Sequence, residues 1–196
     1  MNRPPVLGFV GSSGSGKTTL LEQVIGHLTD AGVRVAVVKH AKPGFDLDTD
    51  TRKDSYRLRS AGADQLLIAS RDRWALMAQQ ADPLEEPSLA VMLRHLDPST
   101  LDAVLVEGFK HESYPKIEVF RPSRGRPLQC WLQDPSVIAV ASDVRIETAP
   151  ATWLDLNDSL AVARFVALRL GLSQLPSGPT GLHSAVPNEN THNVPR

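Results

Sequence analysis

The chain has 196 residues, with 21 Lys and Arg against 22 Asp and Glu, and a formal net charge of −1 at pH 7. This balance argues against a nucleic-acid or anionic-membrane binder, because both depend on an excess of basic residues or on a basic face. Hydrophobic residues make up 41% of the chain and charged residues 22%, which is ordinary globular usage and allows a buried core. The single cysteine, Cys130, excludes an internal disulfide framework, and we predict that it is a small buried apolar residue.

The two ends of the chain differ from its middle. Residues 1–8 lack the apolar stretch of a secretory signal, and no apolar run approaches the roughly 18 residues that cross a bilayer. These features predict a soluble, cytoplasmic protein. Residues 173–196 are rich in proline, glycine and small polar residues and cannot bury enough apolar surface to offset their ordering entropy. We therefore predict one domain over residues 1–172 and a disordered tail over 173–196, with a partner-binding arm as the alternative for the tail.

Strand-like and helix-like patterns alternate along residues 6–170. The short apolar run 6–10 predicts a strand, and apolar residues at helical spacing from Leu20 to Leu28 predict a helix that Gly32 ends. The next predicted elements are a strand over 33–40 and a short polar helix over 53–61. The turn 71–73 then joins two strands, 65–69 and 74–78, in an antiparallel pair.

The second half of the chain continues this alternation. We predict a helix capped by Ser88 and running through Leu96, and a final helix capped by Asn157 and running through Leu170. Between them lie predicted strands over 103–106, 117–120 and 137–141. Strands separated by helices imply right-handed crossovers. The predicted fold class is therefore α/β, with a mostly parallel sheet, helices on both faces and an antiparallel addition.

Residues 11–18 match the phosphate-binding loop pattern G-x-x-x-x-G-K-[ST] at every specified position. The loop lies between an apolar strand and an amphipathic helix, which is the context of a P-loop NTPase fold. Its glycines let consecutive N–H groups turn inward around a phosphate, and the helix start adds its positive dipole end. The predicted nucleotide-binding residues of this loop are Gly11, Ser12, Ser13, Gly14, Ser15, Gly16, Lys17, Thr18 and Thr19.

A magnesium ion accompanies such a loop, and the sequence offers oxygen ligands for it. The Thr18 hydroxyl is one, and Lys17 supplies a charge to the outer phosphates. Glu107 follows four apolar residues and precedes a glycine, so we predict it at the carboxyl end of a buried strand, as a metal or water-positioning residue. An ordinary solvated carboxylate at the strand end is the alternative. The acidic segment after the second strand contributes Asp46 or Asp48 as a further candidate, with a solvated loop as the alternative.

Several basic residues are candidates for anion contacts, and each also has an ordinary surface or structural role as its alternative. Lys39 and His40 end the second strand; a helix over 53–61 brings Lys53 and Arg57 to one face. A loop rich in arginine follows the strand 117–120 and is either a kinase-like lid or a plain surface loop. The remaining members of these groups are Arg59, Arg121, Arg124 and Arg126.

The sequence says less about the base. The chain contains no Asn-Lys-x-Asp run of the kind that recognises guanine. Asp143, directly after the strand 137–141, is the remaining candidate, because a carboxylate accepts hydrogen bonds from the ring N–H and amino group of guanine. A turn residue is the alternative for Asp143.

An ordered set of motifs resembles the bacterial MobB family of molybdopterin-guanine dinucleotide biosynthesis proteins over residues 6 to 170. The phosphate loop alone is generic, but the order of the whole set is specific to that family. The matching segments are residues 11–19, 38–40, 45–48, 53–63, 73–77, 105–110 and 137–143.

The resemblance implies a GTP-binding adapter with Mg²⁺, usually homodimeric, with weak intrinsic GTPase activity. It implies the molybdenum cofactor guanylyltransferase, which attaches GMP to molybdopterin, as partner, and leaves a direct contact with molybdopterin open. The chain has no obvious catalytic glutamine or arginine finger, which predicts slow hydrolysis without a partner. Two other functions stay open: a small-molecule kinase that uses ATP, and an interaction scaffold that needs no nucleotide.

Overall fold

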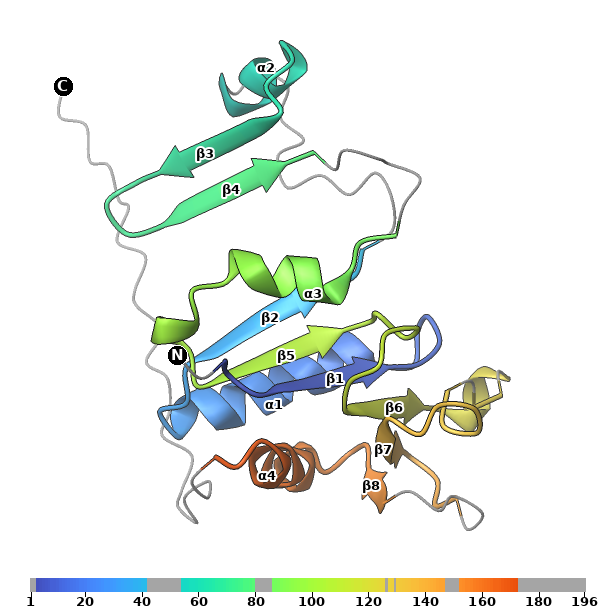
Figure 1. Cartoon of the computed structure of the whole chain (residues 1–196). Helices are drawn as coiled ribbons and strands as arrows, with labels where there is room; N and C mark the ends of the chain where they lie inside the picture. Colours follow the sequence, from blue (N-terminus) through green and yellow to red (C-terminus); the bar gives the residue numbers. More distant parts are fainter. Residues whose placement is uncertain are drawn as a thin grey trace, which may run out of the picture.

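A computed structural model describes residues 3–41, 54–79, 86–125, 127–128, 130–146 and 152–172. Its centre is a six-stranded sheet in the order β2-β5-β1-β6-β7-β8, and every neighbouring pair is parallel (Figure 1). The strands are β1 Val6–Val10, β2 Val35–Lys39, β5 Ala103–Glu107, β6 Lys116–Phe120, β7 Val137–Ser142 and β8 Thr152–Asp155. Because all six strands are parallel, their carboxyl ends meet at one edge of the sheet, where the connecting loops gather.

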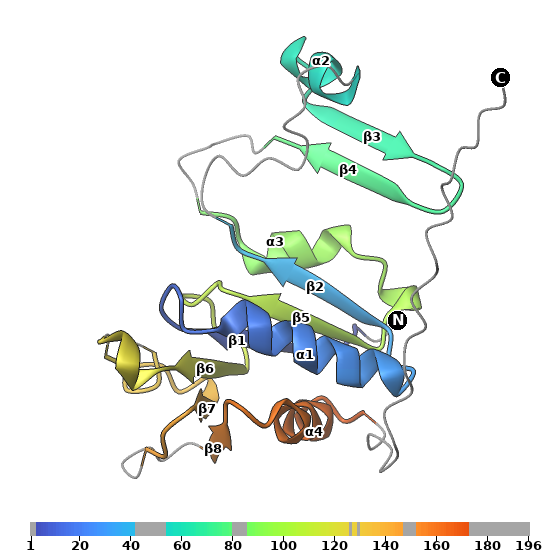
Figure 2. The same ribbon diagram turned by 180° about the vertical axis from the view of Figure 1, so that it is seen from behind.

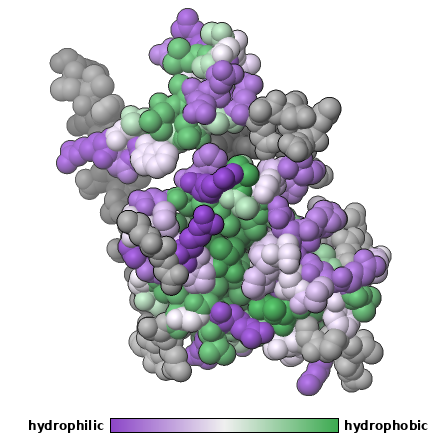
Figure 3. Space-filling view, in the orientation of Figure 1, coloured by the Kyte–Doolittle hydropathy of each residue, from purple (hydrophilic) through white to green (hydrophobic). Residues whose placement is uncertain are grey.

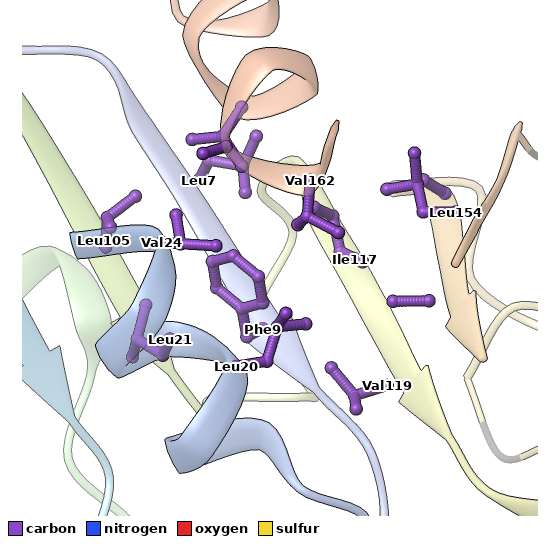
Figure 4. Close-up of a cluster of buried hydrophobic side chains, with 14 of the residues drawn as sticks. Leu7, Phe9, Leu20, Leu21, Val24, Leu105, Ile117, Val119, Leu154 and Val162 are labelled. Atoms are coloured by element: carbon purple, nitrogen blue, oxygen red, sulfur yellow. The ribbon is translucent and has the colours of Figure 1, made fainter. Parts of the chain in front are cut away.

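Helices cover both faces of this sheet (Figures 1 and 2). Helices α1 Lys17–Asp30 and α4 Ser159–Arg169 contact each other on one face. Figure 4 shows the core beneath them, where Phe9 of β1 lies among side chains of α1, β6 and α4. The short α3 Leu89–Met92 and its 3₁₀ continuation Leu93–His95 lie on the other face, against β5. The predicted α/β class, with a parallel sheet and helices on both faces, is confirmed.

The antiparallel addition is a separate two-stranded sheet of β3 Gln65–Ala69 and β4 Trp74–Ala78, preceded by α2 Asp54–Ser60. The predicted strand bounds are confirmed to the residue. Leu67, Leu76 and Trp74 lie on one face of this hairpin, since Leu67 pairs with Leu76 and Trp74 is two residues from Leu76. All three side chains are exposed, and Figure 3 shows apolar residues at the surface of this part of the molecule.

Some element boundaries differ from the sequence prediction. The cap of α4 is Asp158, whose carboxylate accepts from the Ala161 N–H at 2.9 Å, and not Asn157. Both are favoured capping residues, so the sequence alone did not separate them. The α-helix after Ser88 ends at Met92 and tightens into a 3₁₀ turn, and Ser88 makes no side-chain cap bond. Strand β8 was not predicted, because four residues at a sheet edge give too short a pattern.

Two predictions from composition concern single features. Cys130 is a buried free cysteine, as predicted, and burial raises the pKa of its thiol. Among the described residues, none of the helices has the length and apolar character needed to span a membrane. The predicted tail, 173–196, lies outside the described residues, so the division into a domain over 1–172 and a tail stays a prediction.

Candidate nucleotide site

The loop between β1 and α1 has the backbone that a phosphate cradle needs. Gly11, Gly14 and Gly16 all have positive φ values, of 136°, 76° and 97°. At Gly11 a Cβ atom would lie 2.3 Å from the carbonyl oxygen of Val119 in β6, so no larger residue fits. The first N–H groups of α1 have no acceptor within the helix and point toward this loop. Ser15 is fully buried, and its hydroxyl has no partner among the described residues.

Lys17 is folded over the loop. Its Nζ donates to the carbonyl oxygens of Gly11 at 3.1 Å and Ser12 at 2.8 Å. Burial lowers the pKa of Lys17 below its usual 10.5, the carboxylate of Glu107 opposes this shift, and the nearby ammonium of Lys39 adds to it. A phosphate group would supply the negative charge that this half-buried ammonium lacks.

Glu107 ends β5, a strand buried along its whole length, and its carboxylate faces the start of α1. The Thr18 hydroxyl donates to Glu107, with its oxygen 3.0 Å from Oε1 and 3.1 Å from Oε2. Lys39, at the end of β2, donates to Glu107 Oε2 at 2.9 Å. The structure therefore brings together three predicted site residues from three separate elements.

The Thr18 and Glu107 oxygens fit a hard divalent cation. Both are oxygen donors, which is the ligand type that Mg²⁺ takes. The Lys39 ammonium, which is half exposed, lies beside both oxygens and places a positive charge where such a cation would stand. The described residues contain no cluster of three His, Cys, Asp or Glu side chains, so phosphate oxygens and water would supply the other ligands.

A cavity of about 720 Å³ opens over the loop. Three of its walls are the phosphate loop, Glu107 and the turn after β6, which contributes Arg121, Ser123 and Arg124. Arg121 Nη1 donates to Asp143 Oδ2 at 2.9 Å. Asp143 Oδ1 is buried and has no hydrogen-bond partner among the described residues. The full lining is Ser13, Gly14, Gly16, Lys17, Thr18, Thr19, Glu107, Arg121, Ser123 and Arg124.

The other sequence candidates fall into two groups. Asp46, Asp48, Lys53 and Arg126 lie outside the described residues, so their roles stay predictions. His40, Arg57 and Arg59 are not among the described residues that line the cavity. His40 pairs with Glu86, with Nε2 2.8 Å from Oε2, and its ring contacts Phe109. Arg57 and Arg59 belong to α2, where Arg57 donates to Asp54 and the Arg59 guanidinium lies over the Tyr56 ring, 5.9 Å from its centroid.

Sequence reasoning missed two buried charged residues on β6, the strand that Arg121 follows. Lys116 and Glu118 lie on one face of β6 and are almost completely buried. Lys116 bonds to Asp134 and to two backbone carbonyls, and Glu118 accepts from the N–H groups of Cys130 and Trp131. The loops that cover this face are irregular, so no periodic pattern in the sequence signals the burial.

The parallel sheet, the strand–loop–helix at its carboxyl edge and the Lys17–Thr18–Glu107 arrangement define an α/β protein of the P-loop NTPase fold. The model of the family MobB, molybdopterin guanine dinucleotide synthesis protein B, matches residues 6–143. The chain belongs to the MobB family.

Curated relatives and solved structures agree with this assignment. The chain is 46% identical over 162 residues to the molybdopterin-guanine dinucleotide biosynthesis adapter protein of Escherichia coli, covering 83% of this chain and 91% of that protein. The Haemophilus influenzae adapter protein is 40% identical over 165 residues, with coverages of 84% and 89%. A crystal structure of molybdopterin-guanine biosynthesis protein B superposes with a TM-score of 0.64 at 28% identity, over 85% of this chain and 99% of the other. The crystal structure of a MobB homolog from Bacillus stearothermophilus superposes with a TM-score of 0.63 at 25% identity, over 85% of this chain and 97% of that one.

Proposed function

We propose that this protein is a GTP-binding adapter in the biosynthesis of molybdopterin guanine dinucleotide. The observation that carries the proposal is the phosphate loop, in which Lys17 lies over the cradle and Thr18 meets Glu107 at one side of the cavity. The curated relatives are named as adapter proteins of this biosynthesis. The cytoplasmic location predicted from the sequence stays a prediction.

In this proposal the loop amides and Lys17 hold the outer phosphates. Thr18 and Glu107 would hold Mg²⁺, in place of the Lys39 ammonium that donates to Glu107 in the free site. The ion, when bound, neutralises phosphate charge. Asp46 remains a candidate further ligand from outside the described residues.

Guanine is the proposed base, and Asp143 is its proposed reader. The buried, unpartnered Oδ1 of Asp143 lies at the carboxyl end of β7, where ligands bind in open α/β sheets. The free carboxylate oxygen there accepts from the ring N–H of guanine, whereas adenine presents an acceptor ring nitrogen at the same place. Hydrogen bonding of Asp143 to the base therefore favours GTP over ATP.

We expect Mg-GTP to bind at least about tenfold more tightly than Mg-ATP, because one hydrogen bond to a charged group is worth about 1.5–3 kcal/mol. Titration calorimetry of both nucleotides measures this ratio. In Asp143→Asn the ratio is expected to fall toward one, because GTP loses more affinity than ATP. Preference for ATP, with transfer of its γ-phosphate to a metabolite, would instead support the small-molecule kinase, and no binding of either nucleotide would support the scaffold.

Hydrolysis by the isolated chain is proposed to be weak. The described lining of the cavity contains no glutamine to position a water, and its one carboxylate, Glu107, is engaged by Thr18 and Lys39. The proposed partner is the guanylyltransferase that attaches GMP to molybdopterin, and molybdopterin itself is a candidate ligand of the joint complex. Comparing GTP turnover by the chain alone with turnover in the presence of that enzyme tests this arrangement.

The proposed assembly is a homodimer, and the hairpin supports it. A two-stranded sheet is marginally stable alone, and this one exposes apolar side chains together with two strand edges that no described strand pairs with. A second copy offers the same face and the same edges, so a twofold contact is self-complementary. The family resemblance points to the same occupant.

We expect Leu67→Glu to convert the dimer to a monomer, because it places a charge at the centre of the Leu67–Leu76–Trp74 face. Leu67 is 62% exposed in the single chain, so the folded monomer tolerates the change. Leu168→Glu on α4, at a residue that is 77% exposed, is the matched control and should remain dimeric. Sedimentation at several concentrations gives the answer. A wild-type monomer, or an unchanged Leu67→Glu dimer, would contradict the proposal.

A further inference from the structure

Arg121 follows β6, and the order of the sheet sets its surroundings. Strand β6 lies between β1 and β7, so the phosphate loop, Arg121 and Asp143 follow three adjacent strands at the same edge. The guanidinium therefore reaches the phosphate loop on one side and Asp143 on the other. At Gly16, the Arg121 Nε lies 3.4 Å from the position that a Cβ would take.

The contact at Gly16 matters because Gly16 immediately precedes Lys17 and is the N-cap of α1. The absence of a side chain there leaves the guanidinium open to the cavity, whose lining includes Arg121 itself. Its side chain is 32% exposed, so it is partly screened from bulk water. Among the described residues this guanidinium has one side-chain hydrogen-bond partner, Asp143, and its other donors, next to the phosphate loop and its cavity, are suited to phosphate oxygens.

Asp143 holds this guanidinium in place. The Arg121 Nη1 to Asp143 Oδ2 contact of 2.9 Å uses one carboxylate oxygen and leaves the other, Oδ1, without a partner among the described residues. The Asp143 side chain is 23% exposed, so the ion pair is less screened than a surface pair. The two oxygens of Asp143 are thereby available for two different tasks, one toward Arg121 and one toward a base.

We propose that Arg121 is a phosphate-binding residue of this site and that Asp143 is the residue that positions it. The inference rests on the proposed nucleotide function and adds a residue to it. One carboxylate then connects the two ends of the nucleotide, because the group that reads the base also orients a cation over the phosphates. Since no described lining residue is a glutamine that could position a water, Arg121 strengthens binding and leaves hydrolysis slow.

Inorganic triphosphate with Mg²⁺ is the probe that isolates this contact, because it has phosphates and no base. We expect Arg121→Ala to weaken its binding about tenfold, which corresponds to about 1.4 kcal/mol. Arg121→Gln should weaken it similarly, since the glutamine amide still donates to Asp143 and carries no charge. The GTP to ATP affinity ratio should stay at its wild-type value in Arg121→Gln. A role of Arg121 as a brace for Asp143 alone would instead preserve triphosphate binding in Arg121→Gln.

The positioning role has its own readout in a double-mutant cycle. Asp143→Ala should weaken triphosphate binding by less than Arg121→Ala, and the double variant should bind no more weakly than Arg121→Ala alone. Additive losses would overturn the positioning role. The control is Arg34→Ala, which breaks an exposed Arg–Asp pair at the opposite edge of the sheet, where Arg34 Nη2 lies 2.7 Å from Asp102 Oδ1.

The failures of the two proposals are distinguishable. If the wild-type chain binds neither GTP nor inorganic triphosphate, the proposed function fails and the inference falls with it. If the wild type binds both, and Arg121→Ala and Arg121→Gln bind triphosphate within twofold of it, the inference alone is overturned. Thermal unfolding of each variant checks that it is folded. If Arg121→Ala does not fold, Arg121→Gln alone decides the test.

Discussion

Lys17→Ala is expected to weaken binding of Mg-GTP at least about 100-fold, the largest loss among single changes in the phosphate loop. Lys17 contributes the ammonium nearest the cradle, and each charged hydrogen bond is worth about 1.5–3 kcal/mol. Two such bonds to the outer phosphates are worth about 3–6 kcal/mol, so the 2.8 kcal/mol of a 100-fold change allows for the bonds that Lys17 gives up in the free site. Fluorescence or calorimetric titration measures the loss directly.

The contacts of Lys17 without nucleotide limit how much affinity Lys17→Ala can lose. Lys17 Nζ already donates to the carbonyl oxygens of Gly11 and Ser12, so binding exchanges those two hydrogen bonds for bonds to phosphate. The gain is the difference between a charged acceptor and two neutral ones. A loss of many thousandfold would therefore indicate collapse of the loop, which far-ultraviolet circular dichroism and unfolding temperature would reveal.

Lys110→Ala is the control for Lys17→Ala, because Lys110 is exposed and does not line the cavity. Both variants lose one ammonium, so any general electrostatic effect on an anionic ligand appears equally in each. We expect Lys110→Ala to bind Mg-GTP within about twofold of the wild type. Equal losses in the two variants would contradict a specific role for Lys17.

The pH profile supplies a second readout of the same residue. Burial lowers the pKa of Lys17 below 10.5, and phosphate binds its protonated form. As the pH rises through this lowered pKa, wild-type affinity should decline before any ordinary lysine titrates. Lys17→Ala should lack this decline, because it has no ammonium to lose.

The sequence predicted the parts of the site that depend on local pattern. The phosphate loop and its helix are contiguous, and the hairpin 65–78 was predicted to the residue because its turn lies between two short apolar runs. Glu107 was placed correctly at the carboxyl end of a buried strand, because continuous apolar character precedes it. In each case the residues that decide the structure are neighbours in the chain.

Arg121 could not be placed in this way. Its position beside Gly16 depends on β6 pairing with β1, and the order of strands in a sheet is set by tertiary packing. The sequence indicated only a basic loop after a strand. The burial of Lys116 and Glu118 could not be predicted either. The alternation of charged and apolar residues in β6 is typical of a half-exposed strand, whereas loops cover its polar face here.

Lys116→Met is expected to lower the free energy of unfolding by about 3–5 kcal/mol, a large share of the 5–15 kcal/mol typical of a domain. The Lys116 side chain is fully buried, and its Nζ has three acceptors, matching its three donors: Asp134 Oδ2 at 2.6 Å and the carbonyls of Lys110 and Glu112. These contacts tie β6 to the loop after β5 and to the loop before β7. Methionine fills the same volume and satisfies none of the three.

Urea unfolding at pH 7 compares this variant with Lys110→Met, in which an exposed lysine is replaced and the unfolding free energy should change by less than about 0.5 kcal/mol. Lys116→Met with Asp134→Asn should recover much of the loss, because neither charge is then left unpaired and the asparagine oxygen still accepts from Ser136. An Lys116→Met midpoint equal to that of the wild type would show that the ion pair contributes nothing to stability.

The loss of unfolding free energy in Lys116→Met should also depend on pH. Burial alone would raise the pKa of Asp134, but hydrogen bonds from Lys116 and Ser136 bring it below its usual 3.8. A carboxyl with a lowered pKa in the folded state stabilises the fold above 3.8 and loses this contribution as the pH falls through the lowered value. In Lys116→Met the hydrogen bond from Lys116 is gone, so the pKa of Asp134 is lowered less than in the wild type and protonation costs the folded state less. The difference between wild type and Lys116→Met is therefore expected to be largest near pH 7 and to narrow below pH 3.8, which urea titrations at both pH values measure.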